Sequence, residues 1–220
     1  MRQIILDTET TGFEPSEGHR LVEIGCLEVV NYLPTGQIFH QYINPERDMP
    51  LGAFEVHGLS REFLSEHPVF KDVAHKFLDF IADSPLVIHN AKFDMKFLNF
   101  ELERYGHKPI ATARAIDTLQ MARKKYPGSP ASLDALCKKF GINNANRKLH
   151  GALLDAELLA EVYLELMGGR QPDLKINPTQ RENVAVEVAS SGKVLPAREF
   201  APTGEELAAH ETLLQRLGRG

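Results

Sequence analysis

The chain has 220 residues and a formal net charge of −5, and 43% of its residues are hydrophobic. This composition suits one globular domain with a full core plus an appendage, and the negative charge argues against a protein that holds a long duplex by electrostatic attraction. The two cysteines, Cys26 and Cys137, are too few for a disulfide framework and lack metal-ligand spacing. There is no room for a signal peptide before the first strand and no membrane-spanning apolar stretch, so we expect a soluble, cytoplasmic protein.

The first predicted element is a strand built on the apolar run Ile4-Ile5-Leu6, which ends in Asp7-Thr8-Glu9. Such a run indicates a strand buried on both faces, where unpaired anions are costly unless a cation balances them. Side chains alternate along a strand, so Asp7 and Glu9 point to one side and Thr8 to the other. The two carboxylates can bind ions together, and their hard oxygens suit Mg²⁺ or Mn²⁺. Taken alone, the pair also fits a solvated strand end.

Further strands and a helical stretch follow the first strand. The runs from Leu21 to Val30 and from Gln37 to Ile43 predict a hairpin, with Leu33 to Gly36 as its turn. From Ser60 the apolar spacing is helical, and a short strand begins at Leu86. Antiparallel strands followed by helix–strand alternation predict an α/β fold, a mixed sheet with helices on both faces.

Asp94 lies in the first turn of the helix predicted after the strand Leu86 to Asn90. This position suits a charge that complements the helix dipole, and it equally suits a metal ligand. The chain then predicts a strand at 114–116 and helices at 118–125, 132–140 and 152–167. We interpret Asp117 and Asp134 as charges at helix starts.

His150 precedes Asp155 by five residues at the start of the last predicted helix. Within one helix this separation would place the two side chains about 140° apart. We therefore expect His150 on the loop that enters the helix and Asp155 facing inward from its first turns.

The character of the chain changes after residue 168. Prolines recur from 169 to 202 and large apolar residues are few, which predicts a flexible linker. Within it, Gln171, Leu174 and Ile176 of the segment 171–176 look like a degenerate clamp-binding peptide. From 203 to 220 we expect an amphipathic helix that begins at a Thr-x-x-Glu capping box. Its apolar face consists of Leu207, Leu214 and Leu217. Such a face either folds back on its own domain or docks on another protein, and we favour docking.

Three motifs together resemble the DEDDh family of 3′–5′ exonucleases. They are Asp7-Thr8-Glu9-Thr10-Thr11-Gly12, His89-Asn90-Ala91-Lys92-Phe93-Asp94 and His150-Gly151-Ala152-Leu153-Leu154-Asp155. Within that family the stretch from 1 to about 168 is most similar to the proofreading subunits of bacterial replicative DNA polymerases. The resemblance implies a ribonuclease H-like fold in a domain spanning 1–168.

The resemblance and the residue types lead to one catalytic scheme. Four carboxylates, from Asp7, Glu9, Asp94 and Asp155, would hold two divalent ions, either Mg²⁺ or Mn²⁺, and would balance their charge. His150 is the candidate general base, because an imidazole can take a proton from water at neutral pH. By resemblance the 3′-terminal nucleotide would contact a further set of residues, namely Thr10, Thr11, Gly12, Val56, His57, Asn90 and Phe93.

We therefore predict a proofreading 3′–5′ exodeoxyribonuclease that acts on single-stranded or frayed DNA 3′ ends. By resemblance its partners are the polymerase alpha subunit, reached through the C-terminal helix, and the sliding clamp, reached through 171–176. Two alternatives stay open from the sequence: a stand-alone exoribonuclease or oligoribonuclease, and a non-catalytic nucleic-acid-binding module on the same fold.

Overall fold

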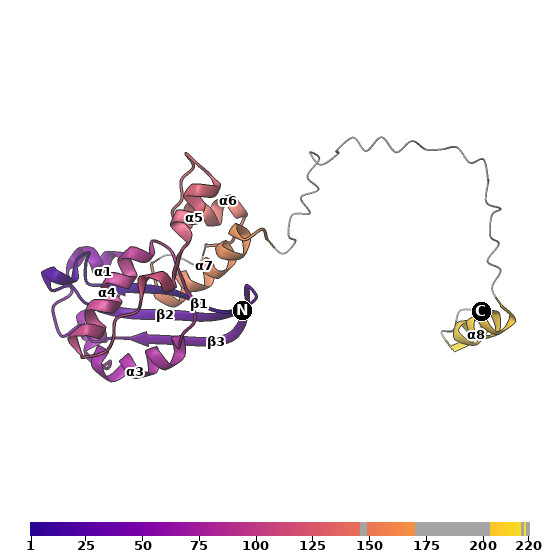
Figure 1. Cartoon of the computed structure of the whole chain (residues 1–220), viewed down its shortest axis with the longest axis horizontal. Helices are drawn as coiled ribbons and strands as arrows, with labels where there is room; N and C mark the ends of the chain where they lie inside the picture. The colour runs from indigo at the N-terminus through magenta and orange to yellow at the C-terminus, as the bar shows by residue number, and fades with distance from the viewer. Residues whose placement is uncertain (146–148, 170–202, 217, 219–220) are drawn as a thin grey trace. The chain divides into compact units, whose positions relative to one another are not determined.

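The computed structural model describes residues 1–145, 149–169, 203–216 and 218 (Figure 1). The chain divides into two units, Met1–Leu174 and Lys175–Gly220. In the second unit the structure describes the helix α8 (Gly204–Arg216) and the residues next to it. Everything below on the sheet and the site concerns the first unit.

A five-stranded mixed sheet forms the centre of the first unit, in the order β3-β2-β1-β4-β5. The strands are β1 (Arg2–Thr10), β2 (Leu21–Val30), β3 (Leu33–Tyr42), β4 (Leu86–Ile88) and β5 (Ala115–Asp117). The pairs β1–β2 and β2–β3 are antiparallel, whereas β1–β4 and β4–β5 are parallel. Parallel pairing of β1 with β4 joins only Ile4 to Leu86 and Ile5 to Val87, so β1 continues well past the end of its neighbour.

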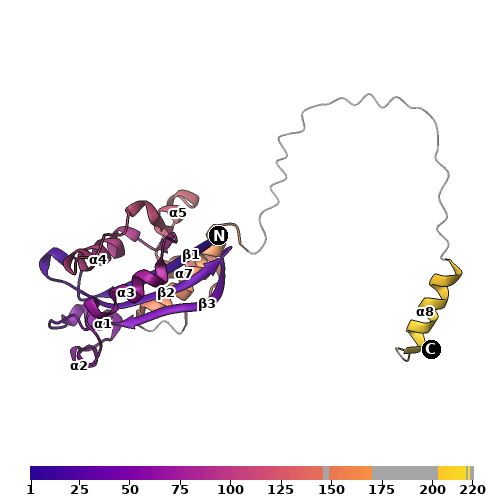
Figure 2. The ribbon, with the colours of Figure 1, turned by 60° about the horizontal axis from the view of Figure 1, so that its bottom comes forward.

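Helices cover both faces of this sheet, as predicted. They are α1 (Leu51–His57), α2 (Arg61–Ser65), α3 (Phe70–Ile81), α4 (Ala91–Arg104), α5 (Thr118–Lys125), α6 (Leu133–Phe140) and α7 (Ala152–Leu166). On one face Ile4 and Leu6 of β1 pack with residues of α3 and α4. On the other face Ile5 packs with residues of α5, α6 and α7. Figure 2 shows α3 and α7 on opposite sides of the sheet. Alternate side chains of β1 thus pack into two separate cores, one on each face of the sheet. Burial of each large apolar side chain stabilises the fold by about 1.5–3 kcal/mol.

The turn of the first hairpin differs from the prediction. It lies at Asn31 and Tyr32, which both have positive φ values of 52° and 68°, the combination that a two-residue type I′ turn requires. The segment from Leu33 to Gly36, predicted as the turn, belongs to β3. Pro34 is tolerated there because β3 is an edge strand, so the missing N–H costs the sheet little.

The helix α1 was not predicted either. It begins directly after Pro50 and its apolar side chains at Leu51, Phe54 and Val56 are 70%, 40% and 45% exposed. Because these apolar side chains are exposed, α1 lacks the buried apolar face by which an amphipathic helix is recognised in a sequence. The helices predicted at 118–125, 132–140 and 152–167 are confirmed within a residue or two.

The capping box of α8 is confirmed. Thr203 accepts a hydrogen bond from the backbone N–H of Glu206 at 3.3 Å, and the Glu206 carboxylate accepts one from the Thr203 N–H at 2.8 Å. Leu207 is 54% exposed and Leu214 is half-buried. Leu217, the linker predicted over 170–202 and the peptide 171–176 lie outside the described residues. Of the helices that the structure describes, none combines the length and the apolar character needed to cross a lipid bilayer.

Gly25 of β2 allows α7 to approach the sheet unusually closely. It pairs with Asp7 across the β1–β2 ladder, and a Cβ atom placed on it would overlap the backbone of Ala152 and Leu153. Those residues begin α7, the helix that carries Asp155. The absence of a side chain at Gly25 therefore sets how near the start of α7 comes to Asp7.

We predict that Gly25→Ala lowers the free energy of unfolding by about 3 kcal/mol, the upper end of the range that overpacking costs. The cost is high because the backbone of α7 must move, whereas a flexible side chain could simply turn aside. Chemical denaturation of the two proteins measures the difference. The matched control is Gly52→Ala, because a Cβ atom at Gly52 meets nothing within 4 Å. Equal stability of Gly25→Ala and wild type would contradict the steric argument.

Candidate active site

A cavity of about 910 Å³ opens where β1 runs past the end of β4. It is lined by every residue predicted to act in catalysis, namely Asp7, Glu9, Asp94, His150 and Asp155. It is also lined by every residue predicted to contact the nucleotide, namely Thr10, Thr11, Gly12, Val56, His57, Asn90 and Phe93. The fold thus brings three segments that are distant in sequence into one hollow.

On the α7 face of the sheet, a compact group joins β1 to the start of α7. Carboxylate oxygens of Glu9 and Asp155 and a ring nitrogen of His150 all lie within 4.8 Å of one another. His150 lies on the loop before α7, as predicted, and its Nδ1 atom is 3.3 Å from Oδ2 of Asp155. The loop is fixed because the His150 N–H donates a hydrogen bond of 3.0 Å to the carbonyl of Val56 in α1. Asp155 is buried while His150 stays largely exposed, so the imidazole faces the mouth of the cavity.

Asp94 reaches the same cavity from α4, on the other face of the sheet. It lies in the first turn of that helix, as predicted, and is 3% exposed. Its Oδ1 atom accepts a hydrogen bond of 2.8 Å from the hydroxyl of Thr8. Asp94 does not belong to the group of Glu9, His150 and Asp155, whose ligand atoms lie within 4.8 Å of one another. Burial raises the pKa of Asp94 to about 7, although the hydrogen bonds from Thr8 oppose that shift.

The donor set fits divalent cations. Asp94 and Asp155 are 3% exposed and Glu9 is 9% exposed, so three carboxylates are held largely away from water in one cavity. Removing charged carboxylates from water is unfavourable unless a cation or hydrogen bonds offset the loss of hydration. Carboxylate oxygens with one imidazole match the preference of Mg²⁺ or Mn²⁺ better than that of softer ions.

His57 ends α1 and lines the same cavity. Its Nδ1 atom accepts a hydrogen bond of 3.0 Å from the N–H of Leu59, so the proton of the neutral ring resides on Nε2. The Nε2 atom is buried and has no hydrogen-bond partner in the part of the chain that the structure describes. Burial is the largest cause that lowers the pKa of His57. The neutral ring therefore offers an unused N–H donor beside the cavity.

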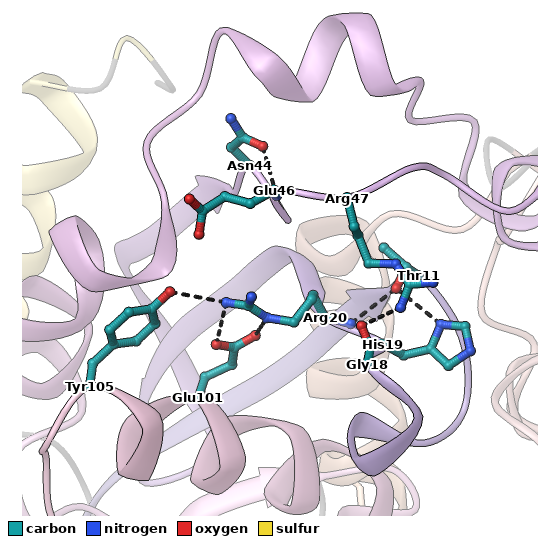
Figure 3. A network of polar contacts seen from close by, with 9 residues as sticks. All are labelled: Thr11, Gly18, His19, Arg20, Asn44, Glu46, Arg47, Glu101 and Tyr105. Atoms are coloured by element: carbon teal, nitrogen blue, oxygen red, sulfur yellow. Dashed lines mark hydrogen bonds and ion pairs between the residues drawn. The ribbon is translucent and has the colours of Figure 1, made fainter.

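The backbone at Thr11 is anchored to α4 by a network of polar contacts (Figure 3). The Thr11 N–H donates to the Arg20 carbonyl at 2.9 Å, and the Arg20 N–H donates to the Thr11 hydroxyl at 3.0 Å. The guanidinium of Arg20 pairs through two nitrogens with the carboxylate of Glu101 in α4, and it also donates to the Tyr105 hydroxyl at 3.2 Å. Both charged side chains are buried, at 6% and 1% exposed. This pair holds the end of β1 against the helix that carries Asp94.

Phe93 and Asn90 occupy the start of α4. Phe93 is half-buried, its ring centroid lies 5.1 Å from that of Phe97, and it also lines the cavity. Phe93 therefore packs against a core aromatic ring and also lines the cavity, where the resemblance predicts contact with the nucleotide. Asn90 is exposed and has a left-handed backbone with φ of 67°, which turns the chain from β4 into the helix.

Several cavity residues were not identified from the sequence. Phe13 is 83% exposed although it is aromatic, and it follows Gly12 directly. The ring of His19 covers Gly12 so closely that a Cβ atom at Gly12 would overlap it. Arg123 of α5 is the one Lys or Arg among the described residues of the lining. Of these residues only Phe13 had a signal in the sequence, because this aromatic residue directly follows the motif glycine Gly12. His19 and Arg123 are brought to the cavity by tertiary contacts, which no local pattern shows.

The family model described as "Exonuclease" matches residues 4–163. DNA polymerase III subunit epsilon of Rickettsia prowazekii is 52% identical over 222 residues, which cover 99% of this chain and 97% of that protein. The protein of the same name from Escherichia coli is 44% identical over 223 residues, covering 97% and 92%.

Solved structures agree with the fold. Exonuclease X in complex with 5′ overhanging duplex DNA superposes with a TM-score of 0.60 at 26% identity, covering 76% of this chain and 91% of that one. The nuclease domain of 3′hExo, a DEDDh family member bound to rAMP, has a TM-score of 0.66 at 20% identity, with 76% and 91% covered. The latter likeness bears on the fold alone, which is the ribonuclease H-like fold predicted. The chain belongs to the exonuclease family and, within it, to the epsilon subunits of DNA polymerase III.

Proposed function

We propose that this chain removes mispaired 3′-terminal deoxynucleotides as the proofreading 3′–5′ exonuclease of DNA polymerase III, releasing nucleoside monophosphates. The observation that carries the proposal is the single cavity that gathers Asp7, Glu9, Asp94, His150 and Asp155 at the open end of β1. Similarity to epsilon subunits along nearly the whole chain supports the same assignment.

Two divalent ions are proposed as the cofactors, either Mg²⁺ or Mn²⁺. When bound, such ions stabilise the charge of a phosphoryl group under attack and lower the pKa of water. Asp7, Glu9 and Asp155 would hold them from the α7 face, and Asp94 would do so from the α4 face. Four carboxylates match the charge of two divalent cations, so the loaded cavity becomes acceptable to an anionic DNA end.

His150 is proposed as the general base. It is the exposed imidazole of the group, 46% accessible, and its Nδ1 lies 3.3 Å from the buried Asp155. That proximity orients the ring, and its exposure lets a proton taken from water leave to solvent. A role as metal ligand is the competing assignment, because its ring nitrogen also lies within 4.8 Å of the carboxylates of Glu9 and Asp155.

The terminal nucleotide would lie between α1 and the start of α4. Thr10, Thr11 and Gly12 line the cavity at the end of β1 and just after it, and Val56 and His57 line it from α1. The half-buried ring of Phe93 is placed to stack on a base, which is worth about 1–3 kcal/mol for any of the four bases. A pocket of this kind does not read sequence, so mismatches would be selected because a mispaired end frays more readily.

The C-terminal unit would attach the enzyme to its polymerase. The proposed partner of α8 is the polymerase alpha subunit, and Leu207 and Leu213 of this helix are each 54% exposed. An amphipathic helix with exposed leucines suits burial in a groove of a partner. The clamp-binding role of Gln171, Leu174 and Ile176 stays a prediction on residues outside the described part of the chain.

The function is tested on labelled primers with matched and mismatched 3′ ends, in DNA and RNA versions, with Mg²⁺ or Mn²⁺ and with a chelator. We expect faster removal of mismatched DNA ends, no removal with the chelator, and a loss of at least about 10³-fold in Asp155→Asn, because this change removes a charge that the metals require. The matched control is Asp79→Asn in α3, which removes the same charge outside the cavity lining. Preferred cleavage of RNA would instead identify a stand-alone exoribonuclease.

For His150 we predict that His150→Gln binds Mn²⁺ and a DNA end normally but cuts slowly. The reason is that glutamine can hydrogen-bond to a water molecule but cannot accept its proton. Calorimetry measures metal affinity, and kcat measures the cleavage step. A loss of Mn²⁺ affinity of tenfold or more would show that His150 is a ligand and not the base.

A chain ending near Gly168 is predicted to fold and to degrade single-stranded DNA at close to the full-length rate, because every described residue that lines the cavity precedes that point. It should no longer co-purify with the polymerase and should correct mismatches poorly in its presence. Attachment through the C-terminal unit would raise the local enzyme concentration at the primer end to roughly millimolar, and truncation removes that advantage. Tight polymerase binding by the truncated chain would contradict the role of α8.

A further inference from the structure

Thr8 lies between two proposed metal ligands in sequence but faces the opposite side of the sheet. Asp7 and Glu9 face α7, whereas Thr8 shares the α4 face with Ile4 and Leu6. Its side chain is 5% exposed, and its hydroxyl donates a hydrogen bond of 2.8 Å to Oδ1 of Asp94. A buried hydroxyl that donates to a buried carboxylate makes a charge-assisted bond, which is stronger and more directional than a neutral one.

The geometry of the sheet explains why this contact can form. Parallel pairing of β1 with β4 ends at Ile5 and Val87, so the edge of β1 beyond that point has no strand beside it. The start of α4 occupies this place, so the Thr8 hydroxyl reaches directly from β1 to the Asp94 carboxylate.

We propose that the Thr8 hydroxyl is a positioning group for Asp94. By engaging Oδ1 it fixes the rotation of the carboxylate and leaves Oδ2 as the oxygen that meets a divalent ion. This inference rests on the proposed function, in which Asp94 is a metal ligand. It assigns a role to Thr8, the middle residue of the Asp7-Thr8-Glu9 motif. Because side chains alternate along β1, Asp7 and Glu9 share one face of the sheet, and Thr8 points from the other face to Asp94.

The chemistry of the site favours orientation over simple packing. A residue at this position needs no hydroxyl to fill space, because valine has the same shape and a stronger preference for strands. Asp94 stands outside the compact group of Glu9, His150 and Asp155. The hydrogen bond that the Thr8 hydroxyl donates to its Oδ1 atom restrains the orientation of its carboxylate. Hydrogen-bond partners of metal ligands typically change metal affinity by 10–100-fold when they are removed.

The test compares Thr8→Val, which keeps the shape and removes the donor, with Thr8→Ser, which keeps the donor and removes the methyl group. Calorimetry on the full-length chain without DNA measures Mn²⁺ affinity. We expect about 10–100-fold weaker binding in Thr8→Val and affinity within about threefold of wild type in Thr8→Ser. Cleavage by Thr8→Val should recover as Mn²⁺ is raised, whereas a packing defect would not respond to metal.

Asp94→Asn in the same titration separates the two claims. If it loses Mn²⁺ affinity while Thr8→Val binds like wild type, the positioning role is wrong and the metal role of Asp94 stands. If Asp94→Asn itself binds normally, the proposed metal site is wrong. Equal weakening in Thr8→Val and Thr8→Ser would assign the effect to packing and would overturn the inference. Circular dichroism of each metal-free variant checks folding, and Thr8→Ala, which also lacks the donor, replaces Thr8→Val should that variant not fold.

Discussion

The site depends on one constraint: β1 is buried on both faces, and it extends beyond the strand beside it. Burial fixes the register of β1, because a slip of one residue would exchange the two cores that Ile4 and Ile5 feed. The same register then decides which side chains beyond Leu6 face α7 and which face α4. Hydrophobic packing in the first half of the strand therefore sets the position of the polar groups in its second half.

This arrangement places charge where the protein is least able to solvate it. Three of the site's carboxylates are nearly inaccessible to water, and the pKa of Asp94 is raised to about 7 by burial. Apolar residues of similar volume at these positions would give a folded state that is equally stable or more stable. Divalent cations bound in the cavity, as proposed, would offset the cost of holding these carboxylates away from water.

The sequence predicted those features that are governed by local periodicity. The central strand, the positions of Asp94 and His150 relative to their helices, and the mixed sheet with helices on both faces follow from patterns of two and 3.6 residues. The hairpin turn was misplaced because Pro34 and Gly36 resemble turn residues, and Gly36 does have a positive φ of 85°. The chain nevertheless reverses at Asn31 and Tyr32, because Val30 pairs with Leu33. Periodicity could not reveal α1, whose apolar side chains are exposed. Contacts such as Thr8 with Asp94 join residues 86 positions apart, and no local pattern encodes them.

The buried pair of Arg20 and Glu101 also limits how this protein can change over generations. Losing either partner leaves a buried charge uncompensated, at about 3–5 kcal/mol, while exchanging both for apolar residues can be neutral. A lineage therefore cannot easily pass from the paired to the unpaired form through single substitutions. Positions 20 and 101 are expected to change together or not at all, so that in a set of aligned descendants they would behave as a single inherited character.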